Sequence, residues 1–461
     1  MFIKIQSYTP LENHQFVLGG QCNFSLGGYM ADGRDGYNEL SDLILTSLLE
    51  LPLYIPEVTF RWTKKTPTEL FYRIMDMARK DKNQRIAFVS DEAKVACLIN
   101  HCGLSWEEAI DYVTVGCNAM ALSGGAMCGS GRANLGKVLN DTFYNDREAV
   151  LKAETFDDFF SIYEKNLYAA LSKNIELGDK FLEIAAKDEC ILASLFLKGC
   201  IESGLSLNKG GAIGFGDFPG DGLICTVDSL AIVKQFVYDE KIATCEKMLD
   251  ALEHNWQGYE DLRNMIISRG KYFGNDDAST NEIAARITTC ISSFAKDKTD
   301  ALGKRYIGIM ANGYRDYNTW FGKVTRATPD GRYDGDSFKV VGAGQTDGRD
   351  RNGLTALLNS VGKYDPTNFY SGITVTNVSL DPELIYNDKN LEKTVKLFES
   401  YFLIGGAQFQ FNAISGEELA DARKNPEKHK NLRVRVSGYS DFFTNLTEEL
   451  QDSIIERTIH K

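Results

Sequence analysis

The sequence predicts an α/β protein, because segments with the patterns of strands and helices alternate along its first hundred residues. Residues 56–62 and 86–89 are short runs of mainly β-branched and aromatic side chains, which is typical of strands. Residues 66–79 lie between them, repeat apolar side chains with helical spacing and place Pro67 in the first turn. With 461 residues, the chain is long enough for two or three ordinary domains or for one large α/β body.

The other local patterns follow in chain order. Residues 10–40 are rich in glycine and polar side chains, which is typical of loops. A helix is expected from Asn38 onward, with Leu43 in its apolar stripe. Ser105 and Glu108 have the spacing of a capping box, so a short helix is expected to follow Ser105. Charged amphipathic helices with solvated polar faces are expected within residues 150–185 and 228–270.

Composition and charge exclude several classes of protein. The chain has 43% hydrophobic and 11% aromatic residues, which suffices for a large core, and its formal net charge is −13. This negative charge argues against nucleic acid or an anionic membrane as a partner. No run approaches the roughly eighteen apolar residues needed to span a bilayer, and the first residues lack the apolar core of a signal peptide. We therefore expect a soluble, cytoplasmic protein.

Neither the cysteines nor the glycine-rich segments predict a bound metal or cofactor. The ten cysteines form no C-x-x-C pair, and the closest spacing is that of Cys97 and Cys102. Zinc sites and compact disulfide frameworks need tighter, repeated spacing. Residues 342–348 are rich in glycine but lack the spacing and the following lysine of a phosphate-binding loop. We expect reduced thiols, no metal and no bound cofactor.

The last thirty residues hold the most specific local pattern. Apolar residues alternate with arginines over residues 432–436, which predicts a short strand. A closing helix is expected after Asn445, which stands three residues before Glu448, with Ile454 in its apolar stripe. Gly438 therefore lies at the tip of a loop between two ordered elements. On these grounds alone it is a turn glycine that needs a positive φ.

The stretch around Gly438 resembles a known family. Residues 435–443 read R-V-S-G-Y-S-D-F-F and are followed by L-x-x-E-L-Q-x-x-I-I-x-R-T. This string is similar to the C-terminal signature of the glycyl radical enzymes, the pyruvate formate-lyase superfamily. Further matching motifs extend the resemblance over essentially the whole chain and lie at residues 27–40, 56–61, 91–92, 116–117, 198–201, 210–212, 274–277, 325–332, 353–360 and 405–412.

The resemblance implies a fold and a division into domains. Members of this family fold as a ten-stranded α/β barrel, built from two half-barrels around a cysteine loop and a glycine loop. Residues 1–335 would then form a truncated pyruvate formate-lyase-like body with the cysteine loop, and residues 336–461 a glycine radical domain. Family members are typically much longer, and this chain starts where their second half starts. The N-terminal half-barrel is therefore expected to be missing.

The resemblance also implies that Gly438 is modified to a glycine radical. A Cα radical is delocalised onto the flanking amide nitrogen and carbonyl, and only glycine lacks the Cβ that would oppose planarity. In this family a radical-SAM activating enzyme installs the radical, and a glycine at a loop tip is expected to be reachable by that enzyme. The resemblance places Cys117 as the second catalytic residue. Its sulfur would take over the radical, and the thiyl would abstract hydrogen from a small organic substrate.

The residues after Cys117 depart from the family pattern. Lyases and dehydratases of the family usually read G-C-x-E, with the glutamate as general acid and base, whereas this chain continues with Asn118 and Ala119. The adjacent cysteine pair of pyruvate formate-lyase proper is absent as well, since Gly116 precedes Cys117. An amide can hydrogen-bond a substrate oxygen but cannot exchange a proton near neutral pH. Neither standard chemistry can therefore be carried over residue by residue.

Several functional alternatives remain open. The first is a glycyl radical enzyme, or its catalytic subunit, with dehydratase- or lyase-type cleavage of a C–O, C–N or C–C bond. The others are a formate C-acetyltransferase and a non-catalytic spare-part or remnant radical subunit. A half-barrel leaves an open sheet edge and an exposed apolar wall, both unfavourable in water. We therefore expect a complementary N-terminal-half chain or a homodimer to cover it.

Overall fold

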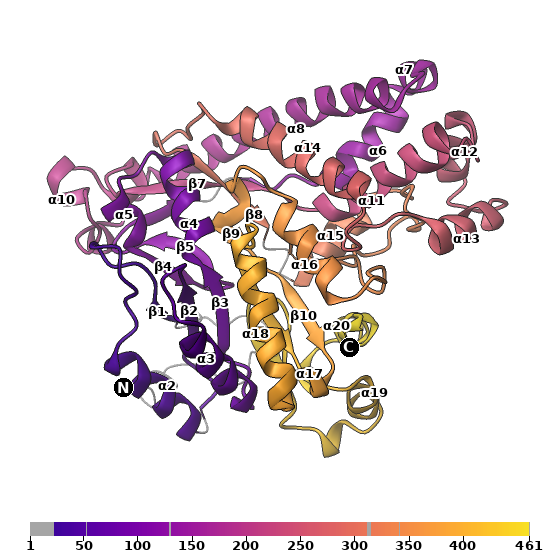
Figure 1. The fold of residues 1–461 in the computed structure, drawn as a ribbon. Coiled ribbons are helices and arrows are strands. Elements are labelled where there is room, and N and C mark those ends of the chain that lie inside the picture. Colours follow the sequence, from indigo (N-terminus) through magenta and orange to yellow (C-terminus); the bar gives the residue numbers. More distant parts are fainter. Residues whose placement is uncertain (1–22, 52, 129–130, 311–314, 341, 461) are drawn as a thin grey trace.

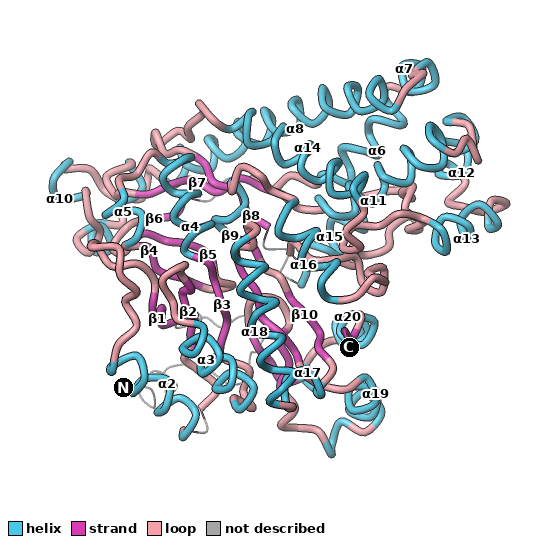
Figure 2. Tube along the Cα trace, viewed as in Figure 1, coloured by secondary structure: helices cyan, strands magenta, loops and turns pink. Residues whose placement is uncertain are grey.

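Two β-sheets surrounded by helices form the centre of the molecule in the computed structural model (Figures 1 and 2). This arrangement confirms the predicted α/β class. Among the helices of the described part of the chain, none is long and apolar enough to cross a bilayer. The structure describes residues 23–51, 53–128, 131–310, 315–340 and 342–460.

The larger sheet has six strands. In spatial order they are β1 (Asn23–Gly27), β2 (Glu57–Trp62), β3 (Ile86–Ser90), β11 (Gln408–Asn412), β10 (Asn377–Leu380) and β14 (Ile459–His460). The first three strands are parallel to one another, as are the last three. The two groups meet antiparallel between β3 and β11. The stacked rings of Phe88 and Phe409, with centroids 4.7 Å apart, pack the two groups together at this junction.

The smaller sheet has four parallel strands: β6 (Ala126–Cys128), β7 (Gly214–Pro219), β8 (Tyr306–Met310) and β9 (Ile373–Thr374). Only two residues separate β9 from β10, so the chain passes directly from this sheet into the larger one. Among the described residues the sheets do not close into a barrel, and β1 and β6 are each paired along one edge only. The ten-stranded barrel that the resemblance implies is therefore not seen as a closed barrel.

Helices pack on both sheets. α3 (Thr68–Lys80) and α18 (Asp388–Leu403) lie side by side over the larger sheet, where Phe71 and Phe402 contact each other (Figure 1). The remaining α-helices are α2 (Glu39–Glu50), α4 (Asp91–Cys97), α5 (Trp106–Ile110), α6 (Leu135–Asn145), α7 (Arg147–Lys152), α8 (Phe156–Ala185), α9 (Ile191–Ser194), α10 (Cys200–Ser203), α11 (Leu223–Ile232), α12 (Cys245–Glu253), α13 (Glu260–Arg269), α14 (Ala278–Ala295), α15 (Arg315–Lys323), α16 (Leu354–Lys363), α17 (Pro382–Tyr386), α19 (Gly416–Lys424) and α20 (Glu448–Glu456).

Local sequence patterns predicted the starts of some helices correctly. The side chain of Asn38 caps α2, and Ser105 forms the expected capping box at the start of α5. The prediction for Leu43 was wrong, because this side chain is 62% exposed on α2. Asn445 does not cap α20 either. It lies in a short 3₁₀ turn, and Thr447 precedes the helix without a side-chain cap.

Two small antiparallel hairpins complete the fold. One consists of β4 (Tyr112–Val115) and β5 (Ala119–Leu122), and the other of β12 (Arg433–Arg435) and β13 (Ser440–Phe442). The second contains the strand predicted for residues 432–436. The first carries Cys117 between its strands and the second carries Gly438. Both reactive residues predicted from the sequence thus lie at hairpin tips.

Candidate active site

Cys117 lies at the tip of a tight turn. The pair Val115–Ala119 is the last of the β4–β5 ladder, which leaves three residues to reverse the chain. Gly116 and Asn118 both have positive φ, +52° and +62°, and the Asn118 N–H donates to the Gly116 carbonyl at 2.8 Å. Glycine and asparagine are the residues that adopt this conformation most readily, which explains their places on either side of the cysteine.

Gly438 lies directly against Cys117. Its hairpin closes with a hydrogen bond from the Val436 N–H to the Tyr439 carbonyl at 2.9 Å, and Gly438 has a φ of +72°. A Cβ on Gly438 would lie 2.5 Å from the Cβ and 2.7 Å from the Cα of Cys117. Both distances are shorter than van der Waals contact allows. The structure therefore brings the two predicted reactive residues together, although they are far apart in the sequence.

The accessibility of Gly438 differs from the expectation. A loop-tip glycine was predicted to be reachable by an activating enzyme, but Gly438 is buried. The cause is the docking of the hairpin tip against the cysteine turn, which covers the Cα. In this conformation an external enzyme cannot reach the α-hydrogen.

A buried ion pair holds both strands of the glycine hairpin. Glu57 on β2 accepts from Arg435 Nη1 at 2.9 Å and from the Ser440 N–H at 3.1 Å. These partners lie on either side of Gly438, one on β12 and one on β13. Glu57 and Arg435 are 3% and 1% exposed. Burial raises the pKa of Glu57, and the charges of Arg435 and Arg433 oppose this effect.

Amide and arginine side chains bind the rest of the glycine loop. Asn377 and Arg457 both donate to the Val436 carbonyl, at 2.7 and 3.0 Å. Asn412 makes two hydrogen bonds to the backbone of Arg435, accepting from its N–H at 2.7 Å and donating to its carbonyl at 2.9 Å. The loop that carries Gly438 is therefore held by strands β10 and β11 and by the chain that follows α20.

Other polar side chains hold the cysteine turn. Asn23 Nδ2 donates to the Gly116 carbonyl at 3.0 Å, and Thr59 Oγ1 donates to Asn118 Oδ1 at 2.8 Å. Lys94 Nζ donates to the carbonyls of Asn118, Ser371 and Gly372 at 3.4, 3.0 and 3.3 Å. Lys94 is fully buried on α4, and its burial lowers its pKa to about 8.

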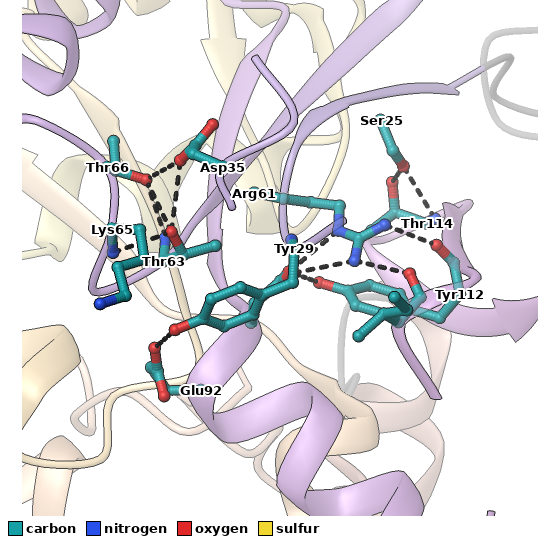
Figure 3. Close-up of polar contacts among 12 residues, drawn as sticks. Ser25, Tyr29, Asp35, Arg61, Thr63, Lys65, Thr66, Glu92, Tyr112 and Thr114 are labelled. Carbon is teal, nitrogen blue, oxygen red and sulfur yellow. Dashed lines mark hydrogen bonds and ion pairs between the residues drawn. The ribbon is translucent and has the colours of Figure 1, made fainter. Parts of the chain in front are cut away.

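A second buried ion pair supports the base of the cysteine hairpin (Figure 3). Arg61 on β2 forms two hydrogen bonds with Asp91, at 2.8 and 2.9 Å, and also donates to the Tyr112 carbonyl at 3.0 Å. The Tyr112 hydroxyl donates to Asp91 at 2.6 Å. Breaking one partner of such a buried pair typically costs about 3–5 kcal/mol. Asp91, which the sequence did not mark as catalytic, therefore has a structural role.

The environment of Cys117 keeps its sulfur protonated. Burial raises the pKa of Cys117 to about 12, and the negative charge of Glu57 adds to this, while Arg435 and Arg132 oppose it. At neutral pH the side chain is therefore a thiol rather than a thiolate. A thiol is the form from which a hydrogen atom can be abstracted.

The carboxylate missing after Cys117 is not replaced at the same place. Asn118 is 1% exposed, and its Nδ2 has no hydrogen-bond partner among the described residues. A buried donor of this kind is costly unless another molecule accepts from it. Asp221 is buried and its burial raises its pKa to about 6, but it already accepts from Arg132 Nη1 at 3.0 Å.

Sequence reasoning missed Glu57 and Lys94, which hold the two loops, and it missed the ion pair of Arg132 and Asp221. Glu57, Lys94, Arg132 and Asp221 have no local pattern that marks them as functional. A weak signal was available for Glu57 and Lys94, since each is a charged residue within an apolar run. The partners of Glu57, and those of Lys94 before β9, lie hundreds of residues away in the sequence. No group of three or more metal-ligating side chains occurs in the described parts of the chain, where the eight cysteines with described side chains are unpaired.

Comparison with known proteins agrees with this geometry. A family model described as pyruvate formate lyase-like matches residues 1–313, and one described as glycine radical matches residues 341–444. The chain belongs to the pyruvate formate lyase-like family. It is a member of the glycyl radical enzyme superfamily, as the resemblance of its motifs predicted. The boundary predicted between residues 335 and 336 falls between the two matched ranges and stays a prediction.

The relatives of this glycyl radical family member include dehydratases and lyases. Trans-4-hydroxy-L-proline dehydratase from Clostridioides difficile is 32% identical over 95% of this chain and 56% of the dehydratase. Isethionate sulfite-lyase from Bilophila wadsworthia is 28% identical over 95% of this chain and 54% of the lyase. The chain thus spans little more than half the length of these relatives.

Solved structures of the superfamily have the same fold. The crystal structure of hydroxyproline dehydratase from Clostridioides difficile with its substrate matches with a TM-score of 0.86 and 30% identity, over 95% of this chain and 57% of that one. The B12-independent glycerol dehydratase from Clostridium butyricum matches with a TM-score of 0.85 and 27% identity, over the same shares. These matches confirm the α/β fold of the glycyl radical enzymes for the part that the chain spans.

Proposed function

We propose that this chain is the catalytic part of a glycyl radical enzyme that uses Gly438 and Cys117. Gly438 stores the radical, and Cys117 transfers it to a small organic substrate. The observation that carries the proposal is the contact between the two residues, where a Cβ on Gly438 would lie 2.5 Å from the Cβ of Cys117. The protonated state of the Cys117 thiol supports it as well.

The proposed cycle moves one hydrogen atom in each transfer. The Gly438 Cα radical takes the hydrogen atom of the Cys117 thiol, which leaves a C–H bond on the glycine and a thiyl on the cysteine. The thiyl then takes a hydrogen atom from a substrate C–H bond, which restores the thiol and leaves a substrate radical. After bond cleavage the product radical takes the hydrogen atom back from Cys117. The thiyl finally takes one from Gly438, so that each turnover ends where it began.

For the reaction we propose dehydratase- or lyase-type cleavage of a C–O, C–N or C–C bond. The dehydratase among the relatives supports cleavage of a C–O bond, and the sulfite-lyase supports lyase-type chemistry in general. Loss of a hydroxyl as water also needs a proton, which Asn118 cannot supply. We therefore propose that the proton donor comes from outside the stretch that follows Cys117. The absence of the family's glutamate after Cys117 favours the second candidate, a non-catalytic spare-part or remnant radical subunit. This chain lacks the adjacent cysteine pair of pyruvate formate-lyase proper, which bears on the third alternative, a formate C-acetyltransferase.

The proposal includes two macromolecular partners. A radical-SAM activating enzyme would install the radical, and a complementary N-terminal-half chain or a second copy would complete the substrate site. Because Gly438 is buried, activation requires the β12–β13 hairpin to leave the cysteine turn. The protein would bind no cofactor of its own, and we propose that it acts in the cytoplasm.

Electron paramagnetic resonance after anaerobic activation tests the proposed function. The wild-type chain, with and without a complementary chain, is expected to give a doublet from the single α-hydrogen of the radical. Gly438→Ala is expected to give no signal, whereas Cys117→Ser is expected to keep the signal but to lose substrate turnover. A signal that survives in Gly438→Ala would contradict the assignment of the radical. A radical without any turnover would favour the spare-part alternative.

A further inference from the structure

An exposed apolar surface lies at one end of the molecule. Six large apolar side chains between the end of α8 and the end of α10 are at least 60% exposed: Phe181, Ile184, Ile191, Leu192, Phe196 and Ile201. We call them the α8–α10 apolar surface. Soluble monomers rarely expose contiguous apolar patches larger than a few hundred Å² unless these bind something. Figure 1 shows α10 at the far end of the molecule from α12 and α13.

This surface belongs to an ordered part of the chain. Ser194 Oγ accepts from the Leu207 N–H at 2.8 Å, and Asn208 donates to the Asp188 carbonyl at 2.7 Å. An ion pair between Lys209 and Glu189 closes the same turn. The apolar side chains are therefore displayed by a folded scaffold that is held by hydrogen bonds and an ion pair within the chain.

Backbone hydrogen bonds join the α8–α10 apolar surface to the start of β6, the terminal strand of the smaller sheet. The Lys198 N–H donates to the Gly124 carbonyl at 2.7 Å, and the Ala126 N–H donates to the Ile213 carbonyl at 2.8 Å. These bonds attach the segment after α9 to the start of β6. Among the described residues β6 pairs only with β7, so its other edge is free to accept a strand.

We propose that a complementary polypeptide packs on the α8–α10 apolar surface and adds a strand to the free edge of β6. The occupant is the part of the relatives that this chain does not match. This inference rests on the proposed function, which includes such a chain. The structure of this chain matches 57% of the hydroxyproline dehydratase chain. More than two fifths of the dehydratase therefore have no counterpart in this chain. An apolar face joined to a sheet whose terminal strand has an open edge suits a folded domain better than a short peptide.

Copurification tests the proposed surface. The probe is the part of Clostridioides difficile trans-4-hydroxy-L-proline dehydratase that this chain does not match, expressed with a tag together with this chain. The variant carries Leu192→Glu and Phe196→Glu, whose side chains are 73% and 77% exposed. The control carries Leu403→Glu on α18, where the side chain is 58% exposed. Exposed positions are chosen so that all three chains keep the same thermal unfolding temperature.

We expect the wild-type chain and the Leu403→Glu control to copurify with the probe, and the double variant to bind at least about tenfold more weakly. Equal binding of the double variant would overturn the proposed surface. Failure of the wild-type chain to bind the probe would overturn the proposed occupant. This holds even if the wild-type chain forms a homodimer that the double variant does not form. The assay itself needs no radical. If the complex forms but anaerobic activation gives it no radical, the proposed function is contradicted and the proposed surface is still supported.

Discussion

Gly438 occupies a position that combines two restrictions. Its φ of +72° is costly for any residue with a Cβ, and the space where a Cβ would lie is filled by Cys117. A turn glycine needs only the first property. The second one distinguishes Gly438 from the other glycines with positive φ that have open space around them, of which Gly335 is one.

Replacing Gly438 by alanine should destabilise the protein more than the same change at Gly335. Gly335 has a φ of +75° and no atom within 4 Å of the place where a Cβ would lie, so Gly335→Ala measures backbone strain alone, about 1–2 kcal/mol. Gly438→Ala adds steric overlap with Cys117 and should cost roughly 1–3 kcal/mol more. Denaturant unfolding of both variants measures the difference. Equal losses would show that the hairpin tip does not press on the cysteine turn.

Cys117 should react slowly with alkylating agents near neutral pH. Burial raises its pKa to about 12, so that the reactive thiolate is scarce. Cys117 and Cys190 are both partly exposed, so exposure alone would not separate them, and we expect iodoacetamide to modify Cys190 well before Cys117, as followed by mass spectrometry of peptides. The Glu57 charge contributes to the raised pKa, so Glu57→Gln should speed the reaction at Cys117. Rapid alkylation of Cys117 in the wild type would contradict this account.

The sequence identified Gly438 and Cys117 through their motifs but not the residues that hold them. Motifs are local strings, whereas Glu57 and Arg435 meet only after the chain has folded. The charge of Glu57 is tolerated in a buried strand because Arg435 and a backbone N–H face it. No pattern in one sequence shows which distant arginine will do so.

At the scale of elements, buried charges hold both reactive hairpins in place. Glu57 bridges the two strands of the glycine hairpin, and Lys94 joins the cysteine turn to the segment before β9. Most strands and helices of the first hundred residues were predicted within a few residues of their ends. β1 was missed because residues 10–40 read as loops, and it is a strand because β2 pairs with it.

Removing the charge of Glu57 should loosen the glycine hairpin. In Glu57→Gln the Arg435 guanidinium loses its buried counter-charge, and breaking such a pair typically costs about 3–5 kcal/mol. Hydrogen exchange should then speed up at the backbone amides of residues 433–442, above all at Ser440. The exposed pair of Lys137 and Asp141 offers a control, since Asp141→Asn should leave this exchange unchanged. Unaltered protection of residues 433–442 in Glu57→Gln would contradict the role given to this pair.

Lys94 should make the stability depend on pH between about 8 and 10.5. Burial lowers its pKa from 10.5 to about 8, so in this range the unfolded chain binds a proton that the folded chain does not. The contribution of Lys94 is therefore present above 10.5 and is lost as the pH falls through 8, a change of roughly 3 kcal/mol. The stability of wild type minus that of Lys94→Met should rise by this amount across the range. A flat difference across this range would contradict it.

At the scale of the whole molecule, two groups of parallel strands meet antiparallel and bring distant loops together. β3 and β11 form this junction, the glycine hairpin packs against β11, and the cysteine hairpin packs against β1 and β9. Local patterns predict strands but not their order, because pairing depends on contacts between distant segments. The resemblance implied a barrel, and the described strands form an open arrangement with free edges at β1 and β6 instead. Those edges explain why a complementary chain is proposed.

The most direct test of the contact between Gly438 and Cys117 follows hydrogen exchange into the radical. The activated chain is transferred to D₂O, where the Cys117 thiol becomes S–D. If the two residues exchange a hydrogen atom, deuterium enters the α-position of Gly438, and the electron paramagnetic resonance doublet should collapse to a singlet. Cys117→Ala should keep its doublet in D₂O. A wild-type doublet that persists, or a Cys117→Ala doublet that collapses equally fast, would contradict direct transfer between Gly438 and Cys117.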